Sequence, residues 1–493
     1  MIHKLYSLTD TVEKAKEPLY IRGIKERKEY SILMHKGEVL DFTTYFNSLS
    51  LKKWKRYTTI KALQLALQLE GRFQVTFHLY DEKGSVRHIS VETKSSCFTY
   101  SMETEELNGV LLGFSLHCMS DVGQYIGGQW NGEFTQWEDK KIGVSITTFK
   151  REKYVKRTMN LLHDFQKDHP WLSVLVVDNG STLEEMQGDR FRVIHNRNFG
   201  GSGGFTRGMI EYVEQGAVDY VLLMDDDIVL ETSALERTFS LLSGIKRGYR
   251  KSFLAGAMLS MERPTVQYEN TAYWNRFISK VMNHGLDLGN IGNLLNNGEF
   301  KQQINQYAGW WYCCIPVQRI REIGYPLPFF IKADDMEYGI RNKREIILMN
   351  GIGVWHEVFS KKISPIIRYY SIRNSLILNH YADGCGLYTL AGAVLGRIYK
   401  YLSERDFKSL EAMNFAIADY LTGFQVITGI PADKKMEQIT QSFERTFTGG
   451  IFIKIILNFA KAVMEYRHLD SSYKQFRGEN MKNSAFWKSY FQK

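Results

Sequence analysis

The most chemically distinctive feature of this sequence is a run of three adjacent carboxylates. Asp225, Asp226 and Asp227 directly follow the apolar residues 221–224. Adjacent carboxylates at the end of a strand repel one another, and a divalent cation shared among them relieves this repulsion. A solvated acidic turn or a helix cap, which is the alternative, accounts for one or two such aspartates. Because the run ends a fully apolar strand, we expect a hard metal ion here.

Two polar sites further along the chain could complete a catalytic centre around this run. Asp334 and Asp335 begin a predicted helix, and a carboxylate from a separate loop can act as general base for a hydroxyl nucleophile. Acidic residues also favour helix N-termini for structural reasons alone. His356 follows Trp355, and a packed core histidine is the alternative to a metal ligand. Imidazole combined with carboxylates suits Mn²⁺, or Mg²⁺ if histidine is tolerated.

A glycine-rich segment at 198–205, with the sequence NFGGSGGF, precedes a predicted helix. Backbone amides beside Asn198, at Gly200 and at Gly201 could approach a diphosphate or a sugar closely. The spacing is not GxGxxG, and GxxxxGK[ST] occurs nowhere in the chain, which argues against hydride transfer and against P-loop chemistry. A flexible linker is the alternative, but a glycine run inside a βαβ pattern is a poor linker.

Two strand ends and an aromatic pair supply further candidate contacts. Arg151 follows the first core strand and could meet a diphosphate, whereas Asp178 and Asn179 end the second strand and could hydrogen-bond a base or a ribose. Each of these residues is equally compatible with turn chemistry, because Asp-Asn-Gly is common in turns. Trp310 and Trp311 could stack on a sugar face, and packing in the core is the equal alternative.

The elements that must carry these residues are predicted to form an α/β core. Apolar strands at 142–149, 173–178 and 220–224 alternate with helical stretches, which is typical of parallel βαβ units. In open α/β sheets the ligand lies at the carboxyl ends of the strands, where these polar residues fall. Short alternating strands from residue 21 to residue 134 indicate a small β-sandwich before the core, and a helical pattern begins near residue 365. The predicted domains are therefore a β-sandwich at 1–138, an α/β domain at 139–364 and a helical domain at 365–493.

Composition and charge narrow the class of protein. With 44% hydrophobic and 24% charged residues in 493, the chain is expected to be ordered almost throughout. The net charge is +9, and residues 441–493 hold nine Lys or Arg against four Asp or Glu. No recognisable nucleic-acid module accompanies this charge, so we expect no nucleic-acid partner. Five scattered cysteines without a CxxC spacing favour a reducing cytoplasm, and we expect neither a signal peptide nor a membrane-spanning segment.

Taken together and in order, these motifs resemble family 2 glycosyltransferases of the GT-A type. The resemblance is greatest to the galactofuranosyltransferases that extend the mycobacterial cell-wall galactan, and it includes the segments before and after the core. The residues that carry it are TTFKRE, VVDNGS, NRNFGGSGGFTRGM, LLMDDDIVLE, the pair Trp310-Trp311, KADDMEYGIR and VWHE. The fold implied is a Rossmann-like GT-A core with an N-terminal β-sandwich and a C-terminal helical region.

The resemblance implies an inverting transfer of galactofuranose from UDP-galactofuranose to a glycan or lipid-linked glycan during bacterial cell-surface polysaccharide synthesis. According to this resemblance, the metal is held by Asp225, Asp227 and His356, and Asp335 deprotonates the acceptor hydroxyl. The predicted contacts with the nucleotide sugar are Arg151, Asp178, Asn179, Asn198, Gly200, Gly201 and Asp226. The predicted contacts with the acceptor or the sugars are Trp310, Trp311 and Asp334.

Departures from the family leave alternatives open. The mycobacterial enzymes are longer and have Trp where this chain has Ala333, which affects the expected acceptor and any polymerising behaviour. Another family 2 sugar transferase, such as a rhamnosyltransferase, is one alternative, and a non-catalytic carbohydrate-binding protein is another. The basic C-terminal stretch could dock at the inner face of the plasma membrane, or it could pack on the core or form the interface of a homo-oligomer.

Overall fold

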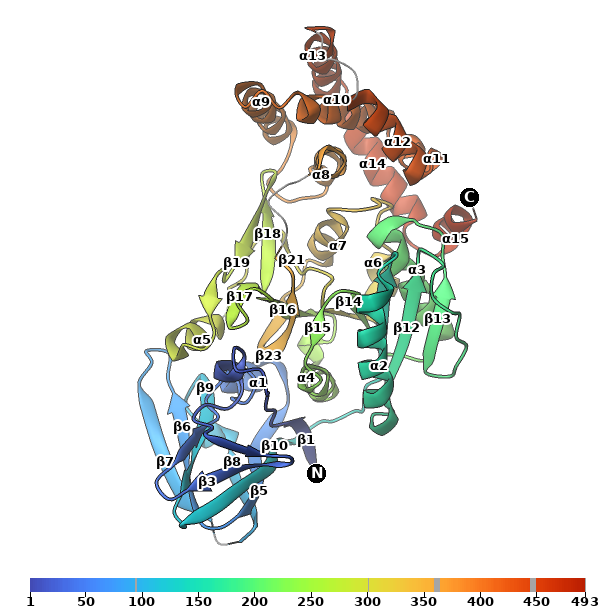
Figure 1. The fold of residues 1–493 in the computed structure, drawn as a ribbon. Coiled ribbons are helices and arrows are strands. Elements are labelled where there is room, and N and C mark those ends of the chain that lie inside the picture. The colour runs from blue at the N-terminus through green and yellow to red at the C-terminus, as the bar shows by residue number, and fades with distance from the viewer. Residues whose placement is uncertain (94, 300, 359–363, 444–448, 493) are drawn as a thin grey trace.

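The computed structural model describes residues 1–493 except 94, 300, 359–363, 444–448 and 493. Figure 1 shows three parts in chain order: a strand-rich part in blue, a central α/β part in green and yellow, and helices in orange and red. This is the predicted fold class, a GT-A-type core between a β-sandwich and a helical region. The part that positions the candidate site is the central one.

The N-terminal part packs two sheets against each other. Its strand β6 alternates, with Phe73, Val75, Phe77 and Leu79 buried and the residues between them partly exposed, which confirms the alternation in the sequence. The first sheet contains β2 (Glu26–Lys28), β3 (Ser31–His35), β10 (Val122–Phe134), β5 (Ile60–Glu70) and β8 (Cys97–Glu103), and β1 (Ile2–Ser7) pairs with β10. The second contains β4 (Val39–Asp41), β9 (Leu111–Cys118), β6 (Phe73–Tyr80) and β7 (Val86–Glu92). Helix α1 (Leu51–Tyr57) also lies in this part.

The central sheet begins with four parallel strands, as the βαβ pattern predicts. These are, in spatial order, β13 (Phe191–His195), β12 (Leu172–Asp178), β11 (Ile142–Thr148) and β14 (Tyr220–Asp225). The register pairs Thr147 with Asp225 and Thr148 with Asp178, so the carboxyl ends of β11, β12 and β14 coincide. The polar residues that follow these strands therefore share one edge of the sheet.

The other half of the central sheet is mixed, which the sequence pattern did not predict. It continues through β22 (Cys313–Pro316), β16 (Phe253–Ser260), β17 (Val266–Glu269) and β20 (Leu286–Asp287), while β23 (Ile346–His356) pairs with β16 and with β15 (Val229–Leu230). Strand β22 runs antiparallel to β14. A separate small sheet contains β18 (Thr271–Asn275), β19 (Ile278–Met282) and β21 (Gln306–Tyr307).

The glycine run forms the start of helix α3 (Gly200–Gln215), which packs directly on the sheet. A Cβ atom at Gly204 would collide with the side chain of Thr147, and one at Gly208 with that of Ser145. Glycine is therefore required for close approach of the helix to β11 as well as for exposing amides at its start. The remaining central helices are α2 (Glu152–Asp168), α4 (Ser233–Ser243), α5 (Ile291–Asn297), α6 (Val317–Ile323) and α7 (Asp334–Asn342).

The C-terminal helices are attached to the core by buried aromatic residues. Trp487 is fully buried, and its indole N–H donates to the carbonyl oxygen of Pro326 at 3.0 Å. The helices are α8 (Pro365–Leu378), α9 (Leu387–Ser403), α10 (Phe407–Thr422), α11 (Phe424–Gly429), α12 (Ala432–Phe443), α13 (Gly449–Met464), α14 (Tyr466–Asn480) and α15 (Ala485–Phe491). Within the described residues, none of the helices has both the length and the apolar character needed to cross a membrane.

A buried carboxylate joins the first strand to the core. Glu236 of α4 accepts hydrogen bonds from the Lys4 ammonium at 2.7 Å and from the backbone N–H of Ser7 at 2.6 Å. Burial opposes ionisation of Glu236, but hydrogen bonds from His169 and Lys4 outweigh it and lower its pKa to about 2. The carboxylate therefore stabilises the folded chain where it is ionised.

Replacing this carboxylate should destabilise the protein in a pH-dependent way. The pKa of Glu236 in the folded chain lies below the ordinary value of 4.5, so its contribution is complete above pH 4.5 and is lost as the pH falls towards 2. We expect Glu236→Gln to lower the free energy of unfolding at pH 7 by about 2–3 kcal/mol, measured by denaturant titration. Glu138→Gln, which removes an exposed partner of Lys140, is the control and should have little effect. A Glu236 difference that persists unchanged below pH 3 would contradict the assignment.

Candidate active site

A cavity of about 880 Å³ opens where β11, β12 and β14 end. It brings together thirteen of the fourteen predicted site residues, although they are spread over more than 200 positions of the chain. These thirteen are Arg151, Asn179, Asn198, Gly200, Gly201, Asp225, Asp226, Asp227, Trp310, Trp311, Asp334, Asp335 and His356. Asp178 is the predicted residue that is not among those lining the cavity.

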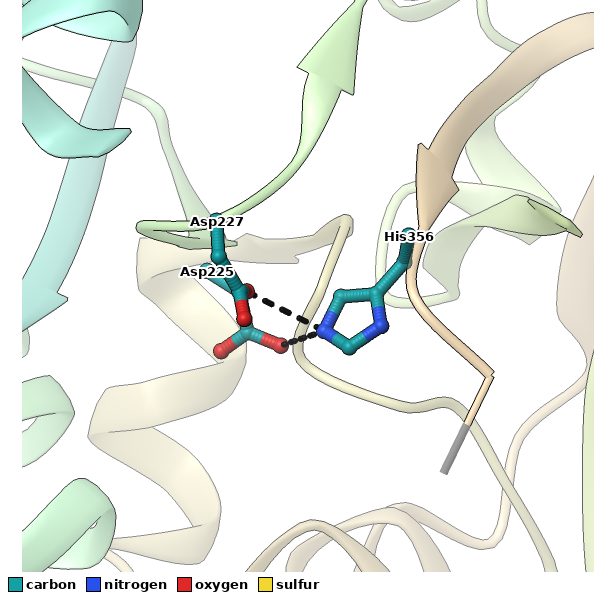
Figure 2. A group of neighbouring side chains, drawn as sticks. All are labelled: Asp225, Asp227 and His356. Atoms are coloured by element: carbon teal, nitrogen blue, oxygen red, sulfur yellow. Dashed lines mark ion pairs between the residues drawn. The ribbon is translucent and has the colours of Figure 1, made fainter. Parts of the chain in front are cut away.

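Asp225, Asp227 and His356 form a group with the spacing of a metal site. One ligand atom from each residue lies within 4.8 Å of the others. Figure 2 shows the imidazole facing both carboxylates, with His356 Nε2 at 3.1 Å from Asp227 Oδ1 and at 3.9 Å from Asp225 Oδ2. The pairing of β15 with β23 brings the histidine, almost 130 positions later in the chain, beside the turn that follows β14.

The protonation of this group indicates how a cation would fit. Burial raises the pKa of Asp225 to about 7, with the neighbouring carboxylates adding to the effect. Although burial opposes it, contact with Asp227 and Asp225 raises the pKa of His356 to about 9. The imidazolium and the guanidinium of Arg151 lower the pKa of Asp227 to about 2, again against burial. Two carboxylates and an imidazole suit Mn²⁺, and because a bound metal requires neutral imidazole, binding would displace a proton from His356.

Arg151 contacts the carboxylates of both Asp226 and Asp227. The Arg151 guanidinium forms an ion pair with Asp227 and lies 3.7 Å from Asp226, and about half of its side chain is exposed at the mouth of the cavity. The carboxylate of Asp226 points instead towards the sheet, where the Thr148 hydroxyl donates to it at 2.7 Å. The middle aspartate is therefore held by β11, while the two outer aspartates face His356.

Asp178 and Asn179 shape the loop after β12. Asp178 is fully buried and accepts hydrogen bonds from three backbone N–H groups within 180–183, at 2.6 to 2.8 Å. This is the turn chemistry that was the alternative for Asp178, so the predicted contact with a nucleotide does not fit its position. Asn179 donates to the carbonyl oxygen of Gly200 at 3.0 Å and accepts from Asn196 at 2.8 Å. It ties the loop to the start of α3.

Asp334 and Asp335 occupy the first turn of α7, as predicted, and both line the cavity. Burial raises the pKa of both carboxyl groups. The backbone N–H of Met336 donates to Asp335 Oδ1 at 2.8 Å. Burial, with a contribution from Asp335, also raises the pKa of Glu269 to about 8. A carboxylate with a raised pKa is a stronger base than one in water, which is the property a general base requires.

Trp310 and Trp311 satisfy both interpretations of the aromatic pair. Both are almost fully buried in the hydrophobic core and both also line the cavity. The indole N–H of Trp311 donates to the carbonyl oxygen of Gly256 at 2.9 Å, and the ring of Trp310 packs edge-on against Phe205. The pair is therefore a rigid wall of the cavity rather than a mobile surface contact.

Sequence reasoning missed one wall of the cavity. Its residues come from β17, from β19 of the small sheet, from the segment before α7 and from α12. None of these residues belongs to a motif recognised in the sequence. These residues are Tyr268, Glu269, Ser279, Val281, Phe330 and Met436. The buried carboxyl group of Glu269 could not be recognised because its importance depends on its distance from Asp335, which only the folded chain defines.

Two family models match separate parts of the chain. The model described as Glycosyl transferase family 2 matches residues 144–248, where the candidate metal aspartates lie. The model described as Galactofuranosyltransferase 2 N-terminal matches residues 5–125, in the β-sandwich. The resemblance drawn from the sequence is confirmed.

Two curated relatives carry the name galactofuranosyltransferase GlfT2. The protein from Mycobacterium tuberculosis is 28% identical over 431 residues, covering 79% of this chain and 66% of the relative. That from Mycolicibacterium smegmatis is 26% identical over 421 residues, covering 78% of this chain and 64% of the relative. The chain thus spans just under two thirds of the length of these relatives.

Solved structures with a similar arrangement are more remote. The structure of Staphylococcus aureus TarS 1-349 is 16% identical with a TM-score of 0.35, covering 68% of this chain and 91% of that one. A mannosyltransferase from Pyrobaculum calidifontis, in complex with GDP-Man and Mn²⁺, is 11% identical with a TM-score of 0.33 and covers 66% of this chain and 87% of that one. Likenesses at this level support no assignment of residues or substrates.

The metal group makes a direct prediction about Mn²⁺ binding. Asp227 is one of the three residues that could hold a metal ion, so we expect Asp227→Ala to weaken Mn²⁺ binding by about 10- to 100-fold, measured from the electron paramagnetic resonance signal of free Mn²⁺ during titration. Asp219→Ala removes a carboxylate just before the opposite end of β14 and is the matched control. Equal Mn²⁺ affinity of the two variants would remove Asp227 from the metal site.

Proposed function

We propose that this chain is an inverting galactofuranosyltransferase that moves galactofuranose from UDP-galactofuranose to a glycan or lipid-linked glycan acceptor in cell-surface polysaccharide synthesis. The observation that carries the proposal is the cavity itself. The group Asp225, Asp227 and His356, the half-buried carboxyl groups of Asp334 and Asp335, and the rigid pair Trp310 and Trp311 all line this one cavity. Both matching family models and the names of the curated relatives agree with this reaction.

The residues divide the chemistry between two sides of the cavity. A Mn²⁺ or Mg²⁺ ion held by Asp225, Asp227 and His356 would supply positive charge for the departing diphosphate. On the other side, Asp335 accepts the proton of the acceptor hydroxyl as that oxygen attacks the anomeric carbon. Because attack and departure occur on opposite faces of the sugar, the configuration inverts without a covalent enzyme intermediate.

The remaining cavity residues would bind and orient the two substrates. Arg151, which now pairs with Asp227, is free to meet the diphosphate once a cation neutralises that carboxylate. Asn198 and the amides at the start of α3 would contact the nucleotide, and Asn179 would act by holding Gly200 in place. Trp310, Trp311 and Asp334 would shape the sugar and acceptor positions. We also propose residues 1–138, 139–364 and 365–493 as the three domains.

Other reactions remain alternatives because the donor sugar is not specified by these residues. A family 2 transferase with another donor, such as a rhamnosyltransferase, would use the same metal group and the same base. A carbohydrate-binding protein without catalysis would not require both a metal-binding group and a further pair of carboxyl groups in the same cavity. We propose galactofuranose as the transferred sugar because the family model described as Galactofuranosyltransferase 2 N-terminal matches residues 5–125.

A donor screen tests the proposed reaction. Purified protein with Mn²⁺ and a synthetic lipid-linked galactoside is expected to release UDP from UDP-galactofuranose but not from UDP-galactopyranose or UDP-glucose, nor TDP from TDP-rhamnose. Chelation of the metal should abolish release. Asp335→Asn is the control, because it keeps the shape of the base but cannot accept the proton, and it should lower acceptor-dependent turnover by about 100-fold or more. Turnover with another donor would replace the sugar in the proposal while keeping the mechanism.

The helical region presents an apolar surface, and we propose that it contacts an anionic membrane at the cytoplasmic face. In α13, Ile455 is buried, whereas Ile453 and Leu457 are 61% and 63% exposed. The exposed apolar residues of α9, α10 and α13 are Tyr388, Leu395, Tyr399, Leu402, Phe407, Phe452, Ile453, Ile456, Leu457 and Met464. Helix α13, which carries several of these apolar residues, also carries the exposed Lys454 and Lys461. Exposed apolar and basic residues on one helix are typical of peripheral membrane binding. A homo-oligomer interface is the alternative occupant.

Vesicle flotation distinguishes these two occupants. The chain should float with vesicles containing anionic phosphatidylglycerol and not with neutral phosphatidylcholine vesicles, and Ile453→Ser combined with Leu457→Ser should abolish flotation because both side chains are exposed. If the same pair of substitutions instead converts an oligomer to monomers in sedimentation velocity, and flotation is absent, the surface is a subunit interface.

A further inference from the structure

The short segment that leads into the proposed base has an unusual backbone. Phe330, Lys332 and Ala333 have φ angles of 72°, 66° and 66°. L-amino acids seldom adopt this left-handed region, because the Cβ atom then crowds the backbone. Three such residues in four positions, directly before Asp334 and Asp335, require external contacts that hold the segment in this conformation.

Helix α8 supplies these contacts from the helical region. The side-chain nitrogen of Asn374 lies 3.3, 2.9 and 2.7 Å from the carbonyl oxygens of Phe329, Ile331 and Lys332. The neighbouring Arg373 donates from Nη2 to the carbonyl oxygen of Phe329 at 2.9 Å. Asn374 is fully buried and Arg373 is 3% exposed, so these donors do not compete with solvent.

The two donors are themselves held in place. Arg373 Nε donates to Asn374 Oδ1 at 2.9 Å, and Arg373 Nη1 donates to the Tyr369 hydroxyl at 3.2 Å. The guanidinium also lies against the rings of Tyr369 and Tyr370, with its carbon 5.3 and 5.0 Å from their centroids. The Tyr369 hydroxyl in turn donates to Asp419 of α10. The pair is therefore a rigid unit built by α8 and α10.

Helix α3 makes further hydrogen bonds to the same segment and to Leu327 just before it. The backbone N–H of Ser202 donates to the carbonyl oxygen of Phe330 at 3.2 Å, and the Ser202 hydroxyl donates to the carbonyl oxygen of Leu327 at 2.6 Å. A Cβ atom at Gly200 would collide with the same Phe330 carbonyl. The segment is thus held both by the glycine-rich start of α3 and by the Arg373–Asn374 pair.

We propose that Asn374 and Arg373 are positioning residues for Asp335, and this inference rests on the proposed role of Asp335 as the base. Neither residue is among those lining the cavity, so neither acts on a substrate directly. The backbone N–H of the adjacent Met336 donates to the Asp335 carboxylate. The direction of this carboxylate therefore depends on the backbone of the first turn of α7. By holding the segment 329–333, in which Phe330, Lys332 and Ala333 have positive φ angles, the pair directs that turn towards the cavity.

The test compares Asn374→Ala with Asn379→Ala in the full chain. Asn379 ends the same helix and is equally buried, but it donates to Gly386 and Tyr466 and is thus a matched control. We expect Asn374→Ala to lower kcat for transfer from UDP-galactofuranose by about 10- to 100-fold, the effect of a misplacement of about 1 Å, with an unchanged KM for the donor. Asn374→Asp, which keeps the size and the acceptor for Arg373 but loses the N–H donors, should show the same loss.

A double-mutant cycle separates positioning from general structural support. In an Asp335→Asn background, Asn374→Ala should have no further effect on residual transfer, because the group it positions is already disabled. A loss of the same size in both backgrounds, or an unchanged kcat in the single variant, would overturn the inference. Full transfer by Asp335→Asn alone would instead overturn the base assignment in the proposed function.

Amide hydrogen exchange provides a readout that needs no turnover. Asn374→Ala should accelerate exchange in the peptide covering 329–336 by about tenfold or more, whereas Asn379→Ala should leave it at the level of the unmodified chain. Equal exchange of this peptide in the two variants would overturn the positioning role whatever the donor screen shows.

Discussion

The carboxylates of Asp225, Asp226 and Asp227 stand together at the end of a buried strand, and their mutual repulsion constrains much of the surrounding structure. Each is compensated differently. Asp226 accepts a hydrogen bond from Thr148 in the neighbouring strand, while Asp227 is paired with His356 and Arg151. Asp225 keeps a raised pKa of about 7, the result of burial that no side-chain cation fully offsets. A bound divalent cation would relieve the repulsion that remains between these carboxylates.

Pairing of Asp227 with His356 requires strand β23 to bring the histidine to the same edge of the sheet. The N-terminal part of the chain packs against this strand. The ring of Trp355, next to the histidine, stacks with Tyr20 at a centroid distance of 6.4 Å and contacts Phe46 at 5.5 Å. The Tyr45 hydroxyl donates to a carbonyl oxygen of the same strand at 3.2 Å. The β-sandwich is therefore part of the structural support of the candidate metal site, and not merely an attached module.

The first turn of α7, which also lines the cavity, is supported by the C-terminal helices in a comparable way. Asp334 and Asp335 begin a helix that is preceded by three non-glycine residues of positive φ, and both α8 and α3 donate hydrogen bonds to that segment. The two halves of the proposed chemistry thus rest on different flanking parts of the chain. This arrangement explains in physical terms why the flanking parts accompany the core: each fixes one set of charged groups that would otherwise repel or reorient.

The sequence by itself determined the class of core and most of the candidate site. Apolar strands ending in polar residues predict parallel βαβ units. Because parallel strands end at one edge, the candidates that follow them, Arg151, Asn179 and Asp225 to Asp227, could be expected to meet there. The other candidates that line the cavity, among them Asp335 and His356, lie outside those predicted strands. The sequence left open whether Asp178 bound a ligand or formed a turn, because both uses require the same residue type. The backbone N–H groups that surround its carboxylate decide for the turn.

Only the tertiary structure decided how distant segments complete the cavity. The sequence could not reveal Glu269 as a cavity carboxyl, because its raised pKa arises from burial and from Asp335, far away in the chain. Nor could it assign Asn374, whose side chain matters through three backbone carbonyls about 42–45 positions earlier. Local patterns encode strands, helices and their ends, whereas burial, charge compensation and long-range hydrogen bonds exist only once the chain has folded.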